Sequence, residues 1–401
     1  MKKYLFIIAV LFPLTLLAQK NWQWRGQNRN GMYNETGLLK VWPADGPQLL
    51  WKFEGLGEGH TSAAIANGKI YVNGMHGDKL MLYVFDMKGK LLTEKEIGKE
   101  WDKNHNGTRS SVCINDGKLY IFNALGTLYC LDETTLNVVW KKDLLTDFDG
   151  RNIMWGMTEN PLIVGEKVFM TPGGIKNNMV ALNKNTGALL WSSPGEGTPS
   201  SYCSPLYIGD QSVPMVVTCT HEHIIAFNAD TGEKLWSFPQ KNFRNIHPNI
   251  PIYSDGMIFS TTGYKGGAML LRLKDGGKAV EQVWKNDEMD NQMGSAIKIG
   301  NYVYTSGHEN RYWFCVDWKT GETKYKESDM GECNVISADG MLYVYSTKGE
   351  MSLIKPDPNK FDRVSGFKVT LGTDTHWAHP IIHEGVLYIR HGNALLAYKV
   401  K

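Results

Sequence analysis

The sequence is short of net charge, of long helical patterns and of long apolar runs. Its 401 residues carry 43 lysines and arginines against 41 aspartates and glutamates, without a basic run or stripe. Proteins that bind nucleic acid need clustered positive charge to meet the phosphate backbone, so that class is excluded. No segment alternates polar and apolar residues over helical length, which argues against an α/β fold. With 42% hydrophobic residues, the chain can still bury a large core.

Only the first residues carry a long apolar run. Lys2 and Lys3 precede the apolar residues 4–17, and Ala18 suits a cleavage site, so residues 1–18 are predicted to be a signal peptide. The run is too short to span about 30 Å of hydrocarbon. No cysteine follows it directly, so no lipid attachment is predicted. We therefore expect an exported monomer, periplasmic or secreted, that starts at Gln19 and has no membrane span.

Cysteine is also scarce, with six residues in the chain. An exported protein can form disulfides, and Cys203 and Cys219 flank a hairpin that turns near residues 210–212. This pair is the one disulfide that we predict, while Cys333 is expected to be a free thiol. The remaining three fall where the repeat described next has small buried residues: Cys113, Cys130 and Cys315.

Glycine and tryptophan, in contrast, are abundant and recur in a pattern. The stretch Ala226–Trp236, AFNADTGEKLW, is predicted to be a buried strand, a tight turn and a second strand that ends in a large ring. The same pattern occurs at Ala181–Trp191, Cys130–Trp140 and Cys315–Tyr325, each with an aromatic ring five residues after a threonine. Several copies of one pattern indicate a repeat architecture.

The repeat has a regular period along the chain. Successive glycine-containing turns lie 39 to 49 residues apart, a spacing that fits four short strands per unit and is typical of propeller blades. The eight turns begin at Asn67, Asp116, Gly165, Gly209, Asp255, Gly300, Asp339 and Glu384.

The two ends of the chain are expected to close the ring. The eighth unit, residues 380–401, has room for three strands only, and the isolated stretch at residues 48–53, QLLWKF, has the tryptophan of a fourth strand. We therefore predict an all-β, eight-bladed propeller in one domain over residues 47–401, with seven blades or an open solenoid as alternatives. Residues 19–46 form an N-terminal lead-in, and its polar and aromatic stretch at residues 22–31 is expected to lie against one face.

The rings at the ends of the fourth strands have two interpretations. They could stack on sugars or bases, but a position that repeats in every unit favours packing between blades, beside the glycine turn. These rings are Trp51, Trp140, Trp191, Trp236, Trp284 and Tyr325.

The repeat resembles the tryptophan-docking repeat of PQQ-type propellers, A-x-D-x-x-T-G-x-x-x-W. The match lies at Cys130–Trp140, Ala181–Trp191 and Ala226–Trp236, and this superfamily includes quinoprotein alcohol dehydrogenases and BamB-like envelope proteins. Residues 24–26, Trp-Arg-Gly, with Gly31 resemble a subgroup of secreted PQQ-like proteins. The resemblance implies an eight-bladed fold, and for activity either a dehydrogenase with PQQ and calcium or an envelope protein partner.

Two departures from the dehydrogenases favour a chain without the quinone. The dehydrogenases that hold PQQ carry a ring made by adjacent bonded cysteines, and no two cysteines are adjacent here. They are also much longer, because their loops build the calcium and quinone site. PQQ with calcium is therefore the less favoured cofactor hypothesis, and no other cofactor is predicted.

Polar and aromatic residues gather in the loops of one predicted face. In a propeller, the links between blades and the loops between second and third strands share a face, and every histidine of the eleven except His383 maps to these loops. The predicted ligand-binding residues are His60, His76, Arg109, Trp155, Glu159, Tyr202, His221, His247, His308, Arg311, His376, Trp377 and His379.

Three functions compete for this face. The first is a noncatalytic site for a polar, carbohydrate-like ligand or a protein partner, in which tryptophan stacks on a ring and arginine pairs with a carboxylate. The second is a carbohydrate-active enzyme of the lyase type, with a histidine or tyrosine base. The third is a quinone-dependent alcohol or sugar dehydrogenase. Only His221 and His223 have a spacing that suits metal ligands, and two ligands do not make a site. No metal site and no specific catalytic residue are predicted.

Overall fold

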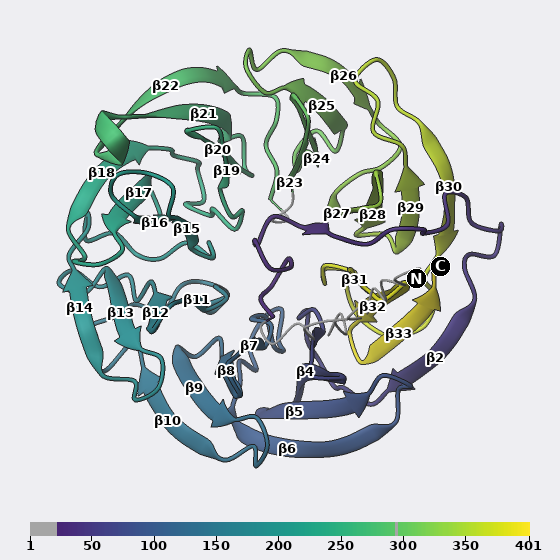
Figure 1. The fold of residues 1–401 in the computed structure, drawn as a ribbon, viewed down its shortest axis with the longest axis horizontal. Helices are drawn as coiled ribbons and strands as arrows, with labels where there is room; N and C mark the ends of the chain where they lie inside the picture. Colours follow the sequence, from purple (N-terminus) through teal and green to yellow (C-terminus); the bar gives the residue numbers. More distant parts are fainter. Residues whose placement is uncertain (1–21, 293–295) are drawn as a thin grey trace, which may run out of the picture.

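The chain forms a closed ring of eight β-sheets around a central axis (Figure 1). A computed structural model describes residues 22–292 and 296–401, and the predicted signal peptide lies outside these residues. In the described residues, all regular secondary structure is β-strand apart from the short 3-10 helix η1 (Asp275–Gly277). The predicted eight-bladed, all-β propeller is confirmed, and the seven-bladed and open alternatives are excluded. No helix in the described part of the chain is long and apolar enough to cross a membrane.

Each blade has four antiparallel strands that follow one another from the axis outward. Blade 1 contains β3 (Ala64–Ala66), β4 (Lys69–His76), β5 (Lys79–Asp86) and β6 (Leu91–Lys99). Blade 2 contains β7 (Cys113–Asn115), β8 (Lys118–Phe122), β9 (Thr127–Asp132) and β10 (Val138–Asp143). Blade 3 contains β11 (Leu162–Val164), β12 (Lys167–Met170), β13 (Met179–Asn183) and β14 (Leu189–Ser193). Blade 4 contains β15 (Leu206–Ile208), β16 (Met215–Cys219), β17 (His223–Asn228) and β18 (Lys234–Pro239).

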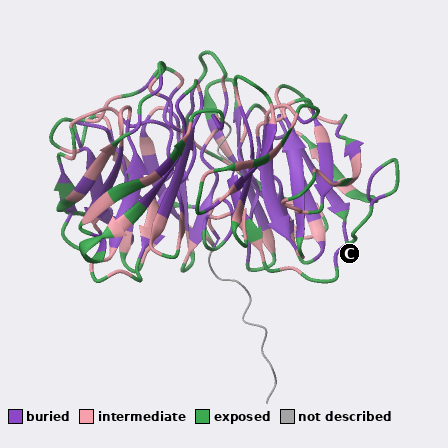
Figure 2. Ribbon diagram, turned by 90° about the horizontal axis from the view of Figure 1, so that it is seen from above, coloured by how far each residue is buried: buried purple, intermediate pink, exposed green. Residues whose placement is uncertain are grey.

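The second half of the ring repeats this order. Blade 5 contains β19 (Ile252–Ser254), β20 (Met257–Thr262), β21 (Gly267–Lys274) and β22 (Ala279–Asn286). Blade 6 contains β23 (Ala296–Ile299), β24 (Tyr302–Ser306), β25 (Trp313–Asp317) and β26 (Thr323–Glu327). Blade 7 contains β27 (Cys333–Ala338), β28 (Met341–Ser346), β29 (Glu350–Ile354) and β30 (Arg363–Lys368). Seen from the side, the strands run between two faces, and exposed residues gather in the loops (Figure 2).

The predicted closure of the ring is confirmed. Blade 8 contains β31 (Ile381–His383), β32 (Val386–His391) and β33 (Ala394–Lys399), and its outer strand is β2 (Leu49–Glu54) from the start of the chain. Trp51 of β2 lies opposite Ala397 of β33 in an antiparallel ladder. The first and last parts of the chain therefore share one sheet.

The repeated tryptophans pack between blades, as predicted. The indole N–H of Trp191 in blade 3 donates to the carbonyl oxygen of Ala229 in blade 4 at 3.2 Å. The ring also covers Gly232, whose φ is +77° and whose position leaves only 2.5 Å between an added Cβ and the ring. Glycine thus serves both the turn and the close approach of the neighbouring ring. The same indole–carbonyl bond joins Trp140 to Lys184, Trp236 to Gly277 and Trp284 to Trp318.

Residues 22–33 of the lead-in cross the ring instead of lying against one face, which corrects the expectation, while Glu35 and Leu38 contact the turns at Glu384 and Asp339. Trp22 forms an antiparallel bridge with Ile114 in blade 2. Across the axis, β1 (Met32–Tyr33) adds to blade 7 as a parallel strand, with Tyr33 opposite Ala338. Figure 1 shows this segment, in purple, crossing the centre of the ring. This course could not be predicted, because the segment has no strand or helix periodicity.

The predicted disulfide is wrong. All six cysteines are buried free thiols. Cys203 lies in the loop before β15, and its thiol is a hydrogen-bonded neighbour of the Cys219 thiol without a disulfide between them. The Cys203 thiol donates to the carbonyl oxygen of Asn249 at 3.3 Å. The expectations of a free Cys333 and of buried Cys113, Cys130 and Cys315 are confirmed.

Candidate ligand-binding site

A cavity of about 340 Å³ opens at the axis on the face that carries the blade links. Each link leaves the outer strand of one blade and returns to the inner strand of the next, so all eight links approach the axis and contribute to the wall. We call this cavity the link pocket. Its lining residues are Trp24, His60, His105, Arg109, Trp155, Thr158, Asn160, Tyr202, Ser204, Ile246, Pro248, Tyr264, Gln292, Glu332, Trp377 and His379.

The structure brings together some of the predicted residues and separates others. Those that line the link pocket are His60, Arg109, Trp155, Tyr202, Trp377 and His379. Those outside its lining are His76, Glu159, His221, His247, His308, Arg311 and His376. The sequence placed the right loops on one face, but it could not tell which side chains reach the axis.

Two of the residues outside the lining are buried supports for the links. Glu159 accepts a hydrogen bond from the backbone N–H of Thr171 at 2.7 Å, and burial raises the pKa of its carboxyl group to about 7. His247 donates from Nε2 to the carbonyl oxygen of His221 at 2.9 Å, and burial lowers the pKa of its imidazole to about 4. Both side chains hold loop backbone in place.

Other predicted histidines make contacts at the edge of the face. His76 donates from Nε2 to the carbonyl oxygen of Gly55 at 3.1 Å. His376 stacks on His391 with ring centroids 3.6 Å apart, and burial lowers the pKa of His376 to about 4. Arg311 is exposed in the loop after β24. None of these side chains needs a ligand to explain its position.

Aromatic rings form a continuous arc along one wall of the link pocket. The Trp377 ring lies 4.9 Å from His60 and 5.3 Å from His105, measured between centroids. The Trp155 ring lies 6.0 Å from His105 and 6.1 Å from Tyr202. These five rings come from five different links, so the arc exists only in the closed ring. Its ring faces and polar edges suit a ligand that has both apolar and polar surfaces.

The lead-in provides the floor of the pocket. The Trp24 ring meets His379 edge-on, with centroids 4.9 Å apart. Below it, the guanidinium of Arg25 donates to the carbonyl oxygens of Ala296 at 2.9 Å and Val335 at 3.4 Å. Burial lowers the pKa of Arg25 to about 10, so this side chain stays charged at neutral pH. Trp24 was missed as a site residue because only the path of the lead-in reveals its position.

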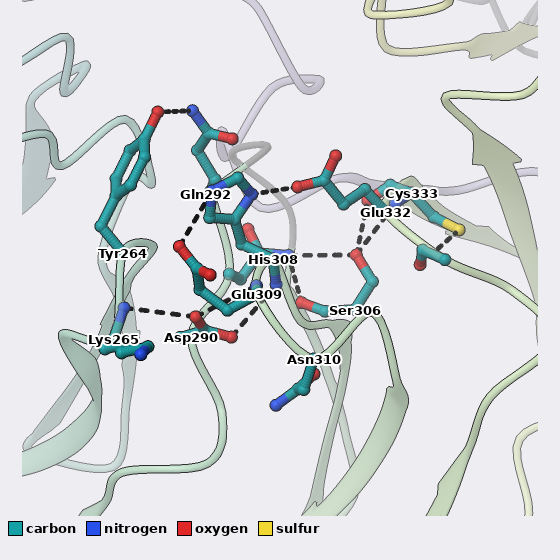
Figure 3. Close-up of polar contacts among 12 residues, drawn as sticks. Tyr264, Lys265, Asp290, Gln292, Ser306, His308, Glu309, Asn310, Glu332 and Cys333 are labelled. Carbon is teal, nitrogen blue, oxygen red and sulfur yellow. Dashed lines mark hydrogen bonds and ion pairs between the residues drawn. The ribbon is translucent and has the colours of Figure 1, made fainter.

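Another part of the wall combines the Gln292 amide and the Tyr264 phenol, and Glu332 beside them pairs with His308 (Figure 3). The Gln292 side-chain amide donates to the Tyr264 hydroxyl at 2.7 Å, and the Tyr264 ring lies 4.6 Å from His308. His308 Nδ1 bonds to the Glu332 carboxylate. Burial lowers the pKa of His308, but the hydrogen bond and charge of Glu332 outweigh burial, so the net shift is upward. The His308 imidazole also lies 3.8 Å from the Glu309 carboxylate, so it contacts two carboxylates.

The comparisons with known proteins place this propeller in a family. A family model described as outer membrane protein assembly factor BamB matches residues 35–213 and 126–358. The chain belongs to this family. A solved structure of BamB from Moraxella catarrhalis superposes with a TM-score of 0.63 and 13% identity, covering 88% of this chain and 99% of that one. At this identity the likeness shows the fold alone.

Dehydrogenases share the same architecture. Quinohemoprotein alcohol dehydrogenase ADHIIG from Pseudomonas putida HK5 superposes with a TM-score of 0.64 and 12% identity, over 95% of this chain and 80% of that one. Quinoprotein ethanol dehydrogenase from Pseudomonas aeruginosa is 31% identical over 90 residues, which are 22% of this chain and 14% of that protein. The aligned stretch is thus a small part of the dehydrogenase, and its activity does not transfer with it.

The described lining of the link pocket in this BamB-family chain does not fit a calcium ion. Among residues 22–292 and 296–401, no three histidine, cysteine, aspartate or glutamate side chains are grouped so that they could hold a metal ion. Glu332 is the one carboxylate in the described lining of the link pocket, and it is bonded to His308. Calcium prefers six to eight oxygen ligands, with carboxylates among them.

Proposed function

We propose that this protein is an exported, noncatalytic binding protein whose link pocket takes a polar, carbohydrate-like ligand without a quinone. The observation that carries the proposal is the aromatic arc of Trp377, His105, Trp155 and Tyr202 facing polar side chains across one cavity. Sugars have apolar ring faces and polar edges, which such a wall matches. The cavity of about 340 Å³ lies within the range of roughly 300–1,000 Å³ for small-molecule sites.

Export and the absence of a quinone rest on separate support. The predicted signal peptide at residues 1–18 and a family described by an outer membrane assembly factor both favour the periplasm or secretion. The separated cysteines and the missing calcium ligand set in the described chain favour a pocket without PQQ. The family description also favours a second candidate, an envelope protein that docks on the same face.

Truncation of one ring in the arc tests the binding proposal. Trp155→Ala is expected to weaken binding of an oligosaccharide by about 10- to 100-fold, because buried aromatic anchors contribute 1.4 kcal/mol or more and each 1.4 kcal/mol is tenfold in affinity. Titration calorimetry against a panel of neutral and acidic oligosaccharides measures this change.

The matched control is an aromatic residue at the other end of the axis. Tyr207 lines a separate cavity of about 460 Å³ on the opposite side of the lead-in, so Tyr207→Ala should bind like the unmodified protein. If no oligosaccharide of the panel binds, or if both variants lose affinity equally, the carbohydrate proposal fails. If the unmodified protein then binds an envelope protein and the Trp155→Ala variant does not, the second candidate is favoured.

Two assays on the same samples separate binding from turnover. Unsaturated products from a uronate polymer, detected by ultraviolet absorbance, would replace the binding proposal with lyase chemistry. Dye reduction after addition of PQQ and calcium would establish the dehydrogenase. The proposal expects neither signal.

A further inference from the structure

Among the described lining residues of the link pocket, Arg109 carries a positive charge that no ion pair with a carboxylate of the described chain neutralises. The Arg109 guanidinium donates to the backbone carbonyls of Gly107 at 3.1 Å and of Asn104 and His105 in its own loop. It also lies 5.9 Å from the centroid of the Trp101 ring. Burial lowers the pKa of Arg109 to about 10, so the side chain is charged at neutral pH. A guanidinium has five N–H donors, and these contacts fix its orientation without occupying all of them.

The carboxylate nearest to Arg109 is itself engaged elsewhere. Glu100 lies buried behind the loop, where its carboxylate accepts the backbone N–H groups of Trp101 at 2.9 Å and Ala124 at 2.8 Å. Burial raises the pKa of Glu100 to about 7, so it is only partly ionised at neutral pH. Glu100 therefore leaves most of the Arg109 charge facing the pocket.

Phenol hydroxyls add further donors to the same cavity. The Tyr202 hydroxyl oxygen accepts the backbone N–H of Trp155 at 3.2 Å, and the Tyr264 oxygen accepts the Gln292 amide at 2.7 Å. With one lone pair engaged in each case, the hydroxyl hydrogen remains available to donate. Burial raises the pKa of Tyr202 to about 12, so its hydrogen stays in place at neutral pH.

The acceptors and histidines around the pocket do not offset this excess of donors. The Glu332 carboxylate is bonded to His308 and is therefore already engaged as an acceptor. Burial, followed by the charge of Arg109, lowers the pKa of His60 to about 3, so His60 is neutral. Among the described lining residues, the Arg109 side of the pocket therefore offers a positive charge and several hydrogen-bond donors.

We propose that the link pocket selects carbohydrates that bear a carboxylate, held by the Arg109 guanidinium and the Tyr202 hydroxyl while the sugar ring rests on the aromatic arc. This inference rests on the proposed function and narrows its ligand class. A carboxylate accepts charge-assisted hydrogen bonds, and it would take them from the N–H groups of Arg109 that the three backbone carbonyls leave free. The neutral phenols supply hydrogen bonds without adding charge.

The experiment compares each acid with its own uncharged derivative. Titration calorimetry is carried out with oligomers of galacturonate, glucuronate and mannuronate, each beside its methyl ester. The unmodified protein should bind at least one acid about tenfold or more tightly than its ester, since hydrogen bonds to charged groups are the stronger ones. Added salt should reduce that preference, because screening weakens charge interactions.

Variants assign the preference to the proposed residues. Arg109→Gln should remove the preference for the acid and leave affinity for the ester within about threefold. Tyr202→Phe, which keeps the ring, should reduce the same preference by a smaller factor. Arg311→Gln is the matched control, because Arg311 is an exposed arginine on the same face and outside the pocket lining. It should leave the preference unchanged.

The outcomes distinguish the two proposals. Equal affinity for acid and ester overturns the carboxylate inference and leaves the carbohydrate function standing. If Arg311→Gln and Arg109→Gln reduce the preference for the acid equally, the carboxylate inference is also overturned, because general surface charge would then explain that preference. Absence of binding by every acid and every ester overturns the proposed function together with the inference. Circular dichroism of Arg109→Gln, compared with the unmodified protein, confirms that the fold is retained.

Discussion

Trp191→Ala is expected to lower the free energy of unfolding by about 3–5 kcal/mol. The Trp191 ring is 9% exposed and fills the contact between blades 3 and 4. Truncation leaves a cavity above Gly232 and removes the indole donor from the carbonyl oxygen of Ala229. Both losses act at a blade interface, on which the cohesion of a repeat protein depends.

Urea denaturation, followed by circular dichroism, measures the change. The matched control is Leu190→Ala in the same strand. Leu190 is 46% exposed, so its truncation should lower the free energy of unfolding by no more than about 0.5 kcal/mol. Equal effects of the two substitutions would contradict the docking role of the tryptophan.

Arg25→Met is expected to lower the free energy of unfolding by about 2–4 kcal/mol and to weaken ligand binding at the same time. The substitution keeps an apolar stem but leaves the buried carbonyls of Ala296 and Val335 without their donor, and each unsatisfied group costs about 1–3 kcal/mol. The floor of the link pocket should also loosen, since Trp24 precedes Arg25 directly and contacts His379. Part of the loss is offset because a buried guanidinium no longer has to be desolvated.

The same denaturation experiment tests this expectation, with calorimetry for binding. Arg311→Met serves as the control, because Arg311 is exposed. If Arg25→Met changes neither the free energy of unfolding nor the ligand affinity, the lead-in does not stabilise the ring.

Local patterns in the sequence were sufficient for the architecture. The turn beginning at Asn228 illustrates the reason, since its side chain accepts the backbone N–H groups of Asp230 and Thr231, and Gly232 follows with positive φ. These contacts are short-range, so residue identity determines them directly. Trp191 recurs at a fixed spacing from such turns, and ring closure followed from counting strands.

The site was only partly predictable, because its contacts join distant parts of the chain. His60 and Trp377 lie in different blade links, and no local pattern says that their rings meet. His308 and Glu332 form a pair only because blades 6 and 7 are neighbours in the ring. The lead-in carries no periodicity, so the position of Trp24 at the pocket floor depends on tertiary packing alone.

The most direct test of the link pocket is hydrogen–deuterium exchange, measured by mass spectrometry with and without the tightest-binding oligosaccharide of the uronate panel. If the link pocket holds the ligand, exchange should slow in peptides from the blade links, which carry pocket-lining residues: residues 105–110, 155–160, 202–204 and 376–379. Peptides at the glycine turns of the opposite face, such as residues 67–69 and 255–257, should exchange at unchanged rates. Protection confined to those turns or to the outer strands, or no protection at the links, would contradict the account.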